Sequence, residues 1–177
     1  MQTTAAPRRS ASRRRSEPDG RRYPDDVPRR DRPSPAKQAA WEGFLRTHLE
    51  LIKRLDRELL ERHGIPLAWY DVLVQLHAAG GETTMGELAD RLLIVPSRCT
   101  RLVERMSAAG LVERRVDAAD ARVRHATITR HGRSQLTAAA ATHLAGIERY
   151  FGSHLTEAQA NEWTALLERM RRSAAVT

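Results

Sequence analysis

Residues 85–133 read MGELADRLLIVPSRCTRLVERMSAAGLVERRVDAADARVRHATITRHGR, and this stretch decides the fold. It holds two short segments with helical periodicity, followed directly by two β-compatible runs. Thr84 and Glu87 have the spacing of a capping box, which predicts the start of the first helix. Pro96 suits the first turn of the second helix, and Gly110 suits its end. The order helix, turn, helix, hairpin is typical of a winged helix-turn-helix.

The apolar residues of this stretch predict which side of each helix faces a core. The first helix is expected to run through Leu88, Ala89, Leu92 and Leu93. The inward stripe of the second helix is expected to contain Cys99, Leu102, Val103 and Met106. Residues 111–116 and 123–129 are expected to form the hairpin, or wing, with Arg122 near its tip.

Arginine dominates the polar side chains of this stretch. Residues 85–133 contain ten arginines, and the whole chain carries a formal net charge of +8. A basic surface on a helix-turn-helix predicts a polyanionic partner, and double-stranded DNA is the natural one. The alternative is a solvated surface whose arginines pair partly with Glu104, Glu113 or Asp120.

The second helix supplies the first group of candidate binding residues. Its outward positions are Ser97, Arg98, Thr100, Arg101 and Arg105. An α-helix fits the major groove, where an arginine can bind guanine O6 and N7 with two hydrogen bonds, so Arg98 and Arg101 are the candidates for base contacts. Ser97 and Thr100 lie early in the helix and are candidates for phosphate contacts, which set register more than sequence.

Long amphipathic helices are expected on both sides of this unit. Residues 36–63 place apolar side chains at steps of three and four, and this stripe is longer than the DNA-reading unit can cover. Part of it is therefore expected to face a second subunit. Residues 134–177 are expected to form two more helices, with Thr129 as the cap of the first and Thr156 and Gln159 as the capping box of the second. The first has an apolar face through Leu136, Ala140, Leu144, Ile147, Phe151 and Leu155, and the last is expected to bury Trp163, Leu166, Leu167 and Met170.

The first 35 residues differ in composition from the rest. They are rich in Arg and Pro and have almost no apolar residue that could anchor a core, so a disordered basic tail is expected. The tail is either a solvated leader or an arm that adds phosphate or minor-groove contacts.

Several classes of protein and site lack their sequence signals. There is no apolar run of about 18 residues and no secretory leader, so a cytoplasmic protein with no membrane partner is expected. Cys99 is the only cysteine, and it is expected to be a small core residue rather than a redox switch. The seven histidines form no H-x-x-x-H pair, and no nucleophile elbow, phosphate loop or dinucleotide motif is present. We therefore expect no catalytic residues, no metal site, no cofactor and no enzymatic activity.

Five short motifs together give the sequence a family resemblance. They are Met85-Gly86-Glu87-Leu88-Ala89, Thr100-Arg101-Leu102-Val103-Glu104-Arg105, Gly110-Leu111-Val112, Asp120-x-Arg122 and Thr127-Ile128-Thr129. With the helix order on either side, they resemble the MarR family of winged-helix regulators over about residues 36–177. The resemblance implies a mainly α fold with a small β-wing, in which residues 66–133 form the winged helix-turn-helix and residues 36–63 and 134–177 form the dimerisation helices.

The resemblance also implies a function and roles for single residues. It implies a cytoplasmic, nucleoid-associated homodimer that binds a pseudo-palindromic promoter site as a repressor. Residues 96–109 would be the recognition helix. Arg122 and Arg124 belong to the DNA-binding wing, with Arg122 in the minor groove and Asp120 bracing it.

Relatives in this family often bind small aromatic or anionic ligands that relieve DNA binding. The candidate ligand cleft consists of Trp41, His48, Trp69, Tyr70 and His77, and ordinary core packing is the alternative for these residues.

Two other functions stay open at this stage. The protein could bind DNA without sequence preference, with the tail supplying most of the affinity, or it could be a winged-helix module that binds an acidic protein.

Overall fold

The computed structural model describes residues 28, 32–117, 119–120 and 122–174. The expected tail, residues 1–35, therefore lies outside the described residues except for 28 and 32–35. The elements in chain order are α1 (Pro35–His63), α2 (Leu67–Ala78), β1 (Glu82–Thr84), α3 (Met85–Arg91), α4 (Pro96–Ala108), β2 (Val112–Val116), β3 (Arg124–Ile128), α5 (Arg130–Tyr150), η2 (Gly152–His154) and α6 (Glu157–Ala174). This mostly helical chain with one small sheet confirms the predicted fold class. No helix in the described part is long and apolar enough to cross a membrane.

The chain divides into two compact units, and the boundary falls inside α1 between Arg46 and Thr47. In the N-terminal unit, the rings of Trp41 and Phe44 lie one turn apart on α1 with centroids separated by 6.2 Å. The second unit, from Thr47 onward, contains all the other elements.

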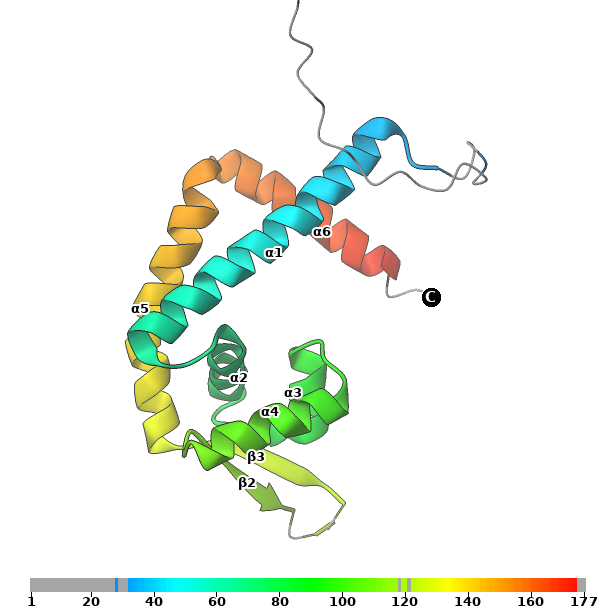
Figure 1. The fold of residues 1–177 in the computed structure, drawn as a ribbon. Coiled ribbons are helices and arrows are strands. Elements are labelled where there is room, and N and C mark those ends of the chain that lie inside the picture. Colours follow the sequence, from blue (N-terminus) through cyan, green and yellow to red (C-terminus); the bar gives the residue numbers. More distant parts are fainter. Residues whose placement is uncertain (1–27, 29–31, 118, 121, 175–177) are drawn as a thin grey trace, which may run out of the picture. The chain divides into compact units, whose positions relative to one another are not determined.

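Residues 67–128, from α2 to β3, form what we call the winged unit. Figure 1 shows α2, α3 and α4 grouped together beside the β2–β3 hairpin. The core of the winged unit is made by apolar side chains from every one of its helices and from β2 and β3. The fully buried members are Val72, Leu73, Leu76, Leu88, Ala89, Cys99, Val103, Met106, Val112 and Ala126. This core confirms the inward positions predicted for Cys99, Val103 and Met106, whereas Leu102 is only partly buried.

The sheet has the strand order β1-β3-β2, with both pairs antiparallel. The predicted hairpin is confirmed, with Val112 opposite Ile128 and Val116 opposite Arg124. Strand β1 was not predicted. It has only three residues, and it is defined by pairing with β3, where Thr84 lies opposite His125. A strand of that length carries no periodicity of its own.

Helices α2, α3 and α4 end in the same hydrogen-bond pattern, but not with the same residue. Two helices end at glycines with positive φ, Gly80 after α2 and Gly110 after α4, as expected for this cap. After α3 the corresponding residue is Leu93, which has a φ of 54°. Its N–H bonds to the Asp90 carbonyl, and the Ile94 N–H bonds to the Ala89 carbonyl. The prediction that Leu93 continues the inward face of the helix was wrong, because its side chain is 92% exposed.

Helix α5 joins the winged unit at its first turn. The Thr129 hydroxyl accepts a hydrogen bond from the Gly132 N–H at 2.9 Å, which confirms the predicted cap. Gly132 lies so close to the Leu111 carbonyl oxygen that a Cβ atom there would overlap it. The predicted capping box of the last helix is also confirmed, since Thr156 and Gln159 exchange hydrogen bonds.

Helices α1 and α5 pack together within the second unit. Gly146 allows close approach, because a Cβ atom at this position would lie 2.6 Å from the Cδ2 atom of Leu55. The Glu58 carboxylate accepts hydrogen bonds from Arg149 at 2.8 Å and from the Tyr150 hydroxyl at 2.5 Å. Leu55 and Leu59 are the buried residues of α1.

The predicted apolar faces of the C-terminal helices are largely uncovered in this chain. On α5, Leu144 is 62% exposed and Ile147 is also exposed, as is Phe151 directly after the helix. In α6, the prediction that Trp163, Leu166, Leu167 and Met170 are buried was wrong: Trp163 and Leu166 are partly exposed, and Leu167 and Met170 are exposed. The amphipathic pattern was real, but the described residues of one chain cover these faces only in part.

Candidate nucleic-acid interface

The outward face of α4 begins with a run of exposed side chains. Ser97, Arg98 and Arg101 are exposed, and Thr100 is partly buried. The Thr100 hydroxyl donates a hydrogen bond to the Pro96 carbonyl at 3.0 Å, so part of its bonding capacity is used within the helix. This face therefore presents two guanidinium groups and a hydroxyl at the start of the helix.

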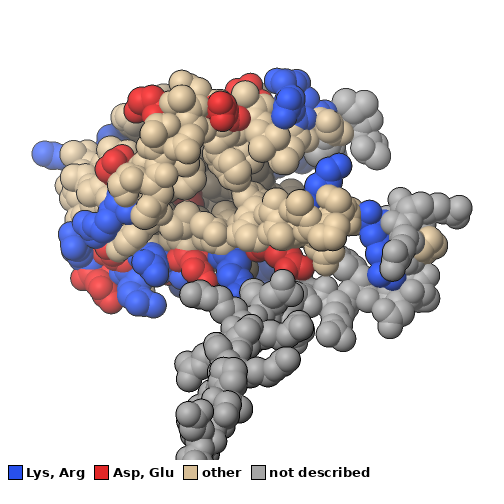
Figure 2. All heavy atoms as spheres, turned by 90° about the horizontal axis from the view of Figure 1, so that it is seen from above, with Lys and Arg blue, Asp and Glu red and all other residues tan. Residues whose placement is uncertain are grey.

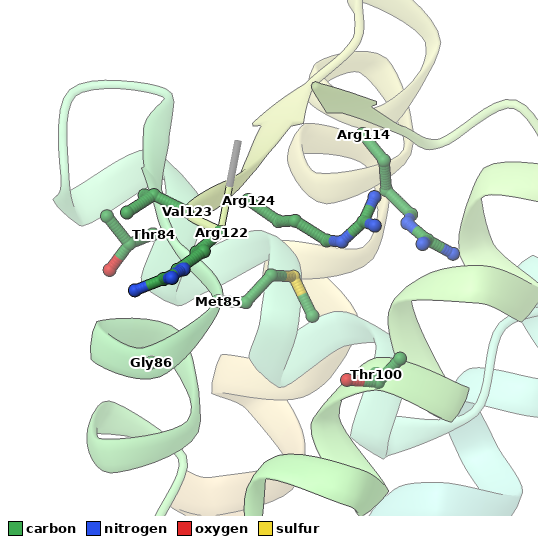
Figure 3. A pocket seen from close by; sticks show the side chains of 8 residues that line it. All are labelled: Thr84, Met85, Gly86, Thr100, Arg114, Arg122, Val123 and Arg124. Atoms are coloured by element: carbon green, nitrogen blue, oxygen red, sulfur yellow. The ribbon is translucent and has the colours of Figure 1, made fainter. Parts of the chain in front are cut away.

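A pocket lies beside this face, between α4, the start of α3 and the wing, which we define as β2, β3 and the loop 117–123. It has a volume of about 380 Å³ and is lined by Thr84, Met85, Gly86, Thr100, Arg114, Arg122, Val123 and Arg124. We call it the three-arginine pocket. Figure 3 shows the side chains of Arg114 and Arg124 extending toward the same side of the pocket, while that of Arg122 lies near Thr84.

One of the three arginines, Arg114, forms an ion pair with Glu104 of α4. Arg114 Nη1 lies 2.8 Å from Glu104 Oε1, and the Arg114 side chain keeps only 30% of its exposure. Among the described residues, Arg122 and Arg124 form no ion pair. The pocket therefore keeps a net positive charge.

Arg114 was not among the predicted site residues. Arg114 is two residues from both Val112 and Val116 on β2. Because every second side chain of a strand points to the same face, Arg114 shares the sheet face of these valines. This alternation was the signal in the sequence that could have identified it.

Two carboxylates organise the wing loop. Asp117 Oδ1 accepts the N–H groups of Ala119 and Asp120 at 2.8 and 3.0 Å, and these bonds together lower the pKa of Asp117. Asp120 Oδ1 accepts the N–H of Arg122 at 2.9 Å. Asp120 therefore braces the backbone of Arg122, and the guanidinium group stays available.

His125 fixes the base of this loop to the rest of the sheet. Its Nε2 atom lies 3.1 Å from Asp117 Oδ2, and its Nδ1 atom lies 3.6 Å from Glu82 Oε1. The histidine thus lies between carboxylates from the loop and from β1. Neither His125 nor Asp117 was a predicted site residue, because both roles depend on strand pairing.

Arg105 is the predicted recognition residue that lies apart from the others. Its guanidinium carbon lies 5.9 Å from the ring centroid of Trp69 on α2. A guanidinium over an indole ring is a favourable cation–π arrangement, so Arg105 stabilises the packing of α4 on α2. The structure thus gives it a contact that the sequence did not predict.

The residues of the predicted ligand cleft have different surroundings in the second unit. Tyr70 is buried, and its ring packs against His143 of α5 with centroids 4.5 Å apart. Trp69 lies beneath Arg105, and His77 is exposed near the end of α2. Trp41 belongs to the N-terminal unit. The cleft and its ligand stay a prediction.

Cys99 is fully buried within the core, and its burial raises the pKa of the thiol. A raised pKa disfavours the thiolate, which is the reactive form. The structure therefore favours the packing role over a redox role.

Comparison with known proteins gives a consistent result. A sequence profile of the MarR family matches residues 63–123. Over 82 residues the chain is 37% identical to the uncharacterized HTH-type transcriptional regulator YsmB of Bacillus subtilis (strain 168); this alignment covers 46% of the chain and 56% of that protein.

Two crystal structures of Streptomyces coelicolor proteins extend the likeness over most of the chain. The MarR family transcriptional regulator AbsC is 26% identical with a TM-score of 0.77, covering 82% of this chain and 99% of AbsC. The MarR family transcriptional regulator Sco3205, solved in complex with DNA, is 28% identical with a TM-score of 0.74, covering 85% of this chain and 91% of Sco3205. The chain therefore resembles the MarR family, in sequence over residues 63–123 and in structure over most of its length.

The match to the MarR family includes residues from both halves of the candidate site, α4 and the wing. The profile match ends at Val123, so it includes all of α4 and the Asp120 and Arg122 positions of the wing. Arg124 lies just beyond it and is placed in the three-arginine pocket by the structure. The predicted resemblance to the MarR family is confirmed.

Proposed function

We propose that this chain is a homodimeric transcriptional regulator of the MarR family that binds duplex DNA in a sequence-specific manner. The observation that carries the proposal is the three-arginine pocket beside the exposed face of α4. Three guanidinium groups around one open pocket repel each other unless an anion lies near them. Glu104 offsets only part of this charge, and a DNA phosphate would offset more.

The two exposed surfaces match the two grooves of DNA. Helix α4 presents Arg98 and Arg101 from a cylinder that fits the major groove, where they bind guanine edges. The wing holds Arg122 on a loop whose backbone Asp120 stabilises, and such an arginine suits the narrow minor groove. Ser97 and the other two arginines of the pocket, Arg114 and Arg124, bind phosphates and set the register.

The uncovered apolar faces support a homodimer. Exposed apolar residues gather on the long helices of the second unit: Leu49 and Ile52 on α1, Leu144 and Ile147 on α5, and Leu167 and Met170 on α6. Monomeric proteins rarely expose this much apolar surface on neighbouring helices. In Figure 2, many of the surface residues seen from above are of types other than Lys, Arg, Asp and Glu.

A symmetric dimer with one winged unit per subunit binds two half-sites. Because the second contact becomes intramolecular, two modest half-site affinities combine into a strong one. The matching DNA target is a pseudo-palindrome in a promoter, and a dimer bound there blocks transcription. The proposed function is therefore that of a repressor.

The test is binding of the full-length protein to duplexes tiled across its own promoter, measured by fluorescence anisotropy at near-physiological salt. We expect one palindromic tile to bind at least about a thousandfold more tightly than a scrambled duplex of equal composition. Arg122→Ala should weaken binding to all duplexes, because the minor-groove contact is lost. Arg124→Ala should also make the slope of log K against log salt less steep by about 0.9, the value for one lost phosphate contact.

Arg57→Ala is the matched control, because Arg57 is an exposed arginine on α1, outside the three-arginine pocket and the exposed face of α4. It should leave both the affinity and the salt slope unchanged. Equal binding to every tile would contradict sequence-specific regulation and favour non-specific DNA binding. Absence of DNA binding would favour an acidic protein partner.

A further inference from the structure

The start of α4 is apolar where a polar residue is usual. Val95 occupies the N-cap position and provides no side-chain hydrogen bond to the helix. Ser, Thr, Asp and Asn are preferred there because their oxygen atoms accept a backbone N–H bond. Val95 gives up that bond, yet its side chain is 63% exposed, so it gains little from burial.

The apolar surface continues on both sides of Val95. Pro96 is exposed, and Leu93 precedes it in the turn with 92% exposure. These residues line a shallow hollow together with Ala89, Asp90 and Ile94. The turn between α3 and α4 therefore presents a small apolar strip next to Ser97.

The surroundings of this strip favour DNA as its partner. The exposed guanidinium groups of Arg98 and Arg101 follow directly on the same helix. A protein partner would need an interface of roughly 800 Å², far more than three side chains provide. The major groove of DNA offers acceptors for the arginines and one apolar group, the C5 methyl of thymine. N-terminal residues of a recognition helix are the ones that contact base edges.

We propose that Val95 and Pro96 bind thymine methyl groups and so fix part of the base sequence that this protein reads. This inference rests on the proposed function and adds to it the class of base read at the start of α4. Neither side chain can hydrogen-bond to a base edge, so the methyl group is what they distinguish. The preferred half-site contains thymine at this position and guanine where Arg98 or Arg101 reaches.

The experiment uses the best-binding duplex selected from a random pool by the full-length protein. Each thymine is replaced singly by deoxyuridine, which removes the methyl group and keeps the hydrogen-bonding edge. We expect one or two positions per half-site at which Kd rises about fourfold, the value for one methyl group that is no longer buried.

Variants of Val95 assign the effect to this residue. With Val95→Ala, Kd for the thymine duplex should rise by a similar factor, and deoxyuridine at the same position should have little further effect. Val95→Ser restores a capping oxygen, so the fold is kept while the two duplexes bind alike. Val116→Ala is the matched control, since Val116 is an exposed valine on β2 and its loss should leave the thymine preference intact.

Three outcomes separate the two proposals. If the protein binds no duplex selectively, the proposed function fails. If it binds a selected duplex but every deoxyuridine substitution leaves Kd unchanged, the proposed thymine contact is wrong. The apolar turn would then be inferred to contact a protein partner instead. If the deoxyuridine effect is as large in Val95→Ala as in the unmodified protein, another residue makes the contact.

Discussion

The winged unit and the long helices around it use their apolar residues in opposite ways. In the winged unit, Leu73, Leu88 and Met106 have no exposed surface, and one chain completes the core. On α5, in contrast, Leu144 is 62% exposed although it continues a regular amphipathic stripe. The difference shows that the amphipathic pattern of a helix identifies a face to be covered, but not whether the same chain covers it. The two regions should therefore respond differently to mutation.

The largest effect is expected where the winged unit meets α5. Gly132→Ala should lower the free energy of unfolding by about 3 kcal/mol, because the new Cβ would overlap the Leu111 carbonyl, a backbone atom that cannot move aside. Chemical denaturation monitored by circular dichroism measures this change. Gly86→Ala, also within a helix but with open space around it, is the control and should leave stability unchanged or slightly raised. Equal effects of the two changes would show that the close approach is unimportant.

The next effect tests the uncovered helices. Leu144→Glu should weaken self-association roughly 30-fold, which corresponds to about 2 kcal/mol, because one leucine from each subunit loses the burial of its exposed part. Sedimentation velocity over a range of concentrations measures the dimer Kd. The fold of each chain should persist, since Leu144 contributes little to the core of its own chain.

Leu93→Glu is the corresponding leucine change in the winged unit. It should leave the dimer Kd unchanged, because the proposed homodimer contact lies on the long helices. An unchanged Kd in Leu144→Glu would show that its face on α5 is not the interface.

A smaller, pH-dependent effect is expected at the joint between the two regions. His143 of α5 packs against Tyr70 of α2, and burial lowers its pKa below the ordinary value of 6.5. The unfolded chain then binds this proton more readily than the folded chain, so His143 should make the protein less stable as pH falls below about 6.5.

Thermal unfolding between pH 8 and pH 5 measures this contribution. His143 Nδ1 is buried without a hydrogen-bond partner in the described structure. His143→Phe should therefore also remove the desolvation penalty of this unpaired nitrogen. The variant should lose less stability on acidification than the unmodified protein. His154→Phe, at an exposed histidine, should keep the original pH dependence. If His143→Phe showed the same pH dependence as the unmodified protein, the loss of stability at low pH would not come from His143.

The smallest effect concerns the exposed apolar residue of the winged unit itself. Leu93→Gly should raise the free energy of unfolding by about 1 kcal/mol, because glycine adopts positive φ without the steric cost that leucine has. Gly110→Leu, the reverse change at the matching position after α4, should lower it by a similar amount. The denaturant midpoints of the two variants measure these changes in the free energy of unfolding. Opposite signs would confirm that the end of α3 is strained, and no gain in Leu93→Gly would contradict it.

Local signals in the sequence predicted much of the fold. The caps at Thr84, Thr129 and Thr156 and the stop at Gly110 each depend on a few neighbouring residues, and all are observed. Strand β1 could not be predicted in this way, because it exists only through pairing with β3 more than 40 positions later. Leu93 was misassigned because its spacing fits a helix, whereas its exposure depends on where the chain turns.

The candidate site was predicted less completely than the fold. The outward arginines of α4 and the position of Arg122 followed from periodicity and from the turn between the two strands. The pairing of Arg114 with Glu104 and the position of His125 between Asp117 and Glu82 depend on contacts between elements. No spacing rule connects these residues, so only the folded chain brings them together.

The hydrogen bonds from Arg149 and Tyr150 to Glu58 join residues 91 and 92 positions apart in the chain. The winged unit lies wholly between them. During synthesis at about 5–20 residues per second, the ribosome therefore needs about 5 to 20 s after making Glu58 to supply its partners. In that interval the winged unit leaves the ribosome and can fold, while α1 still lacks α5. Each new chain should thus complete the winged unit first, and the contact between α1 and α5 should form last.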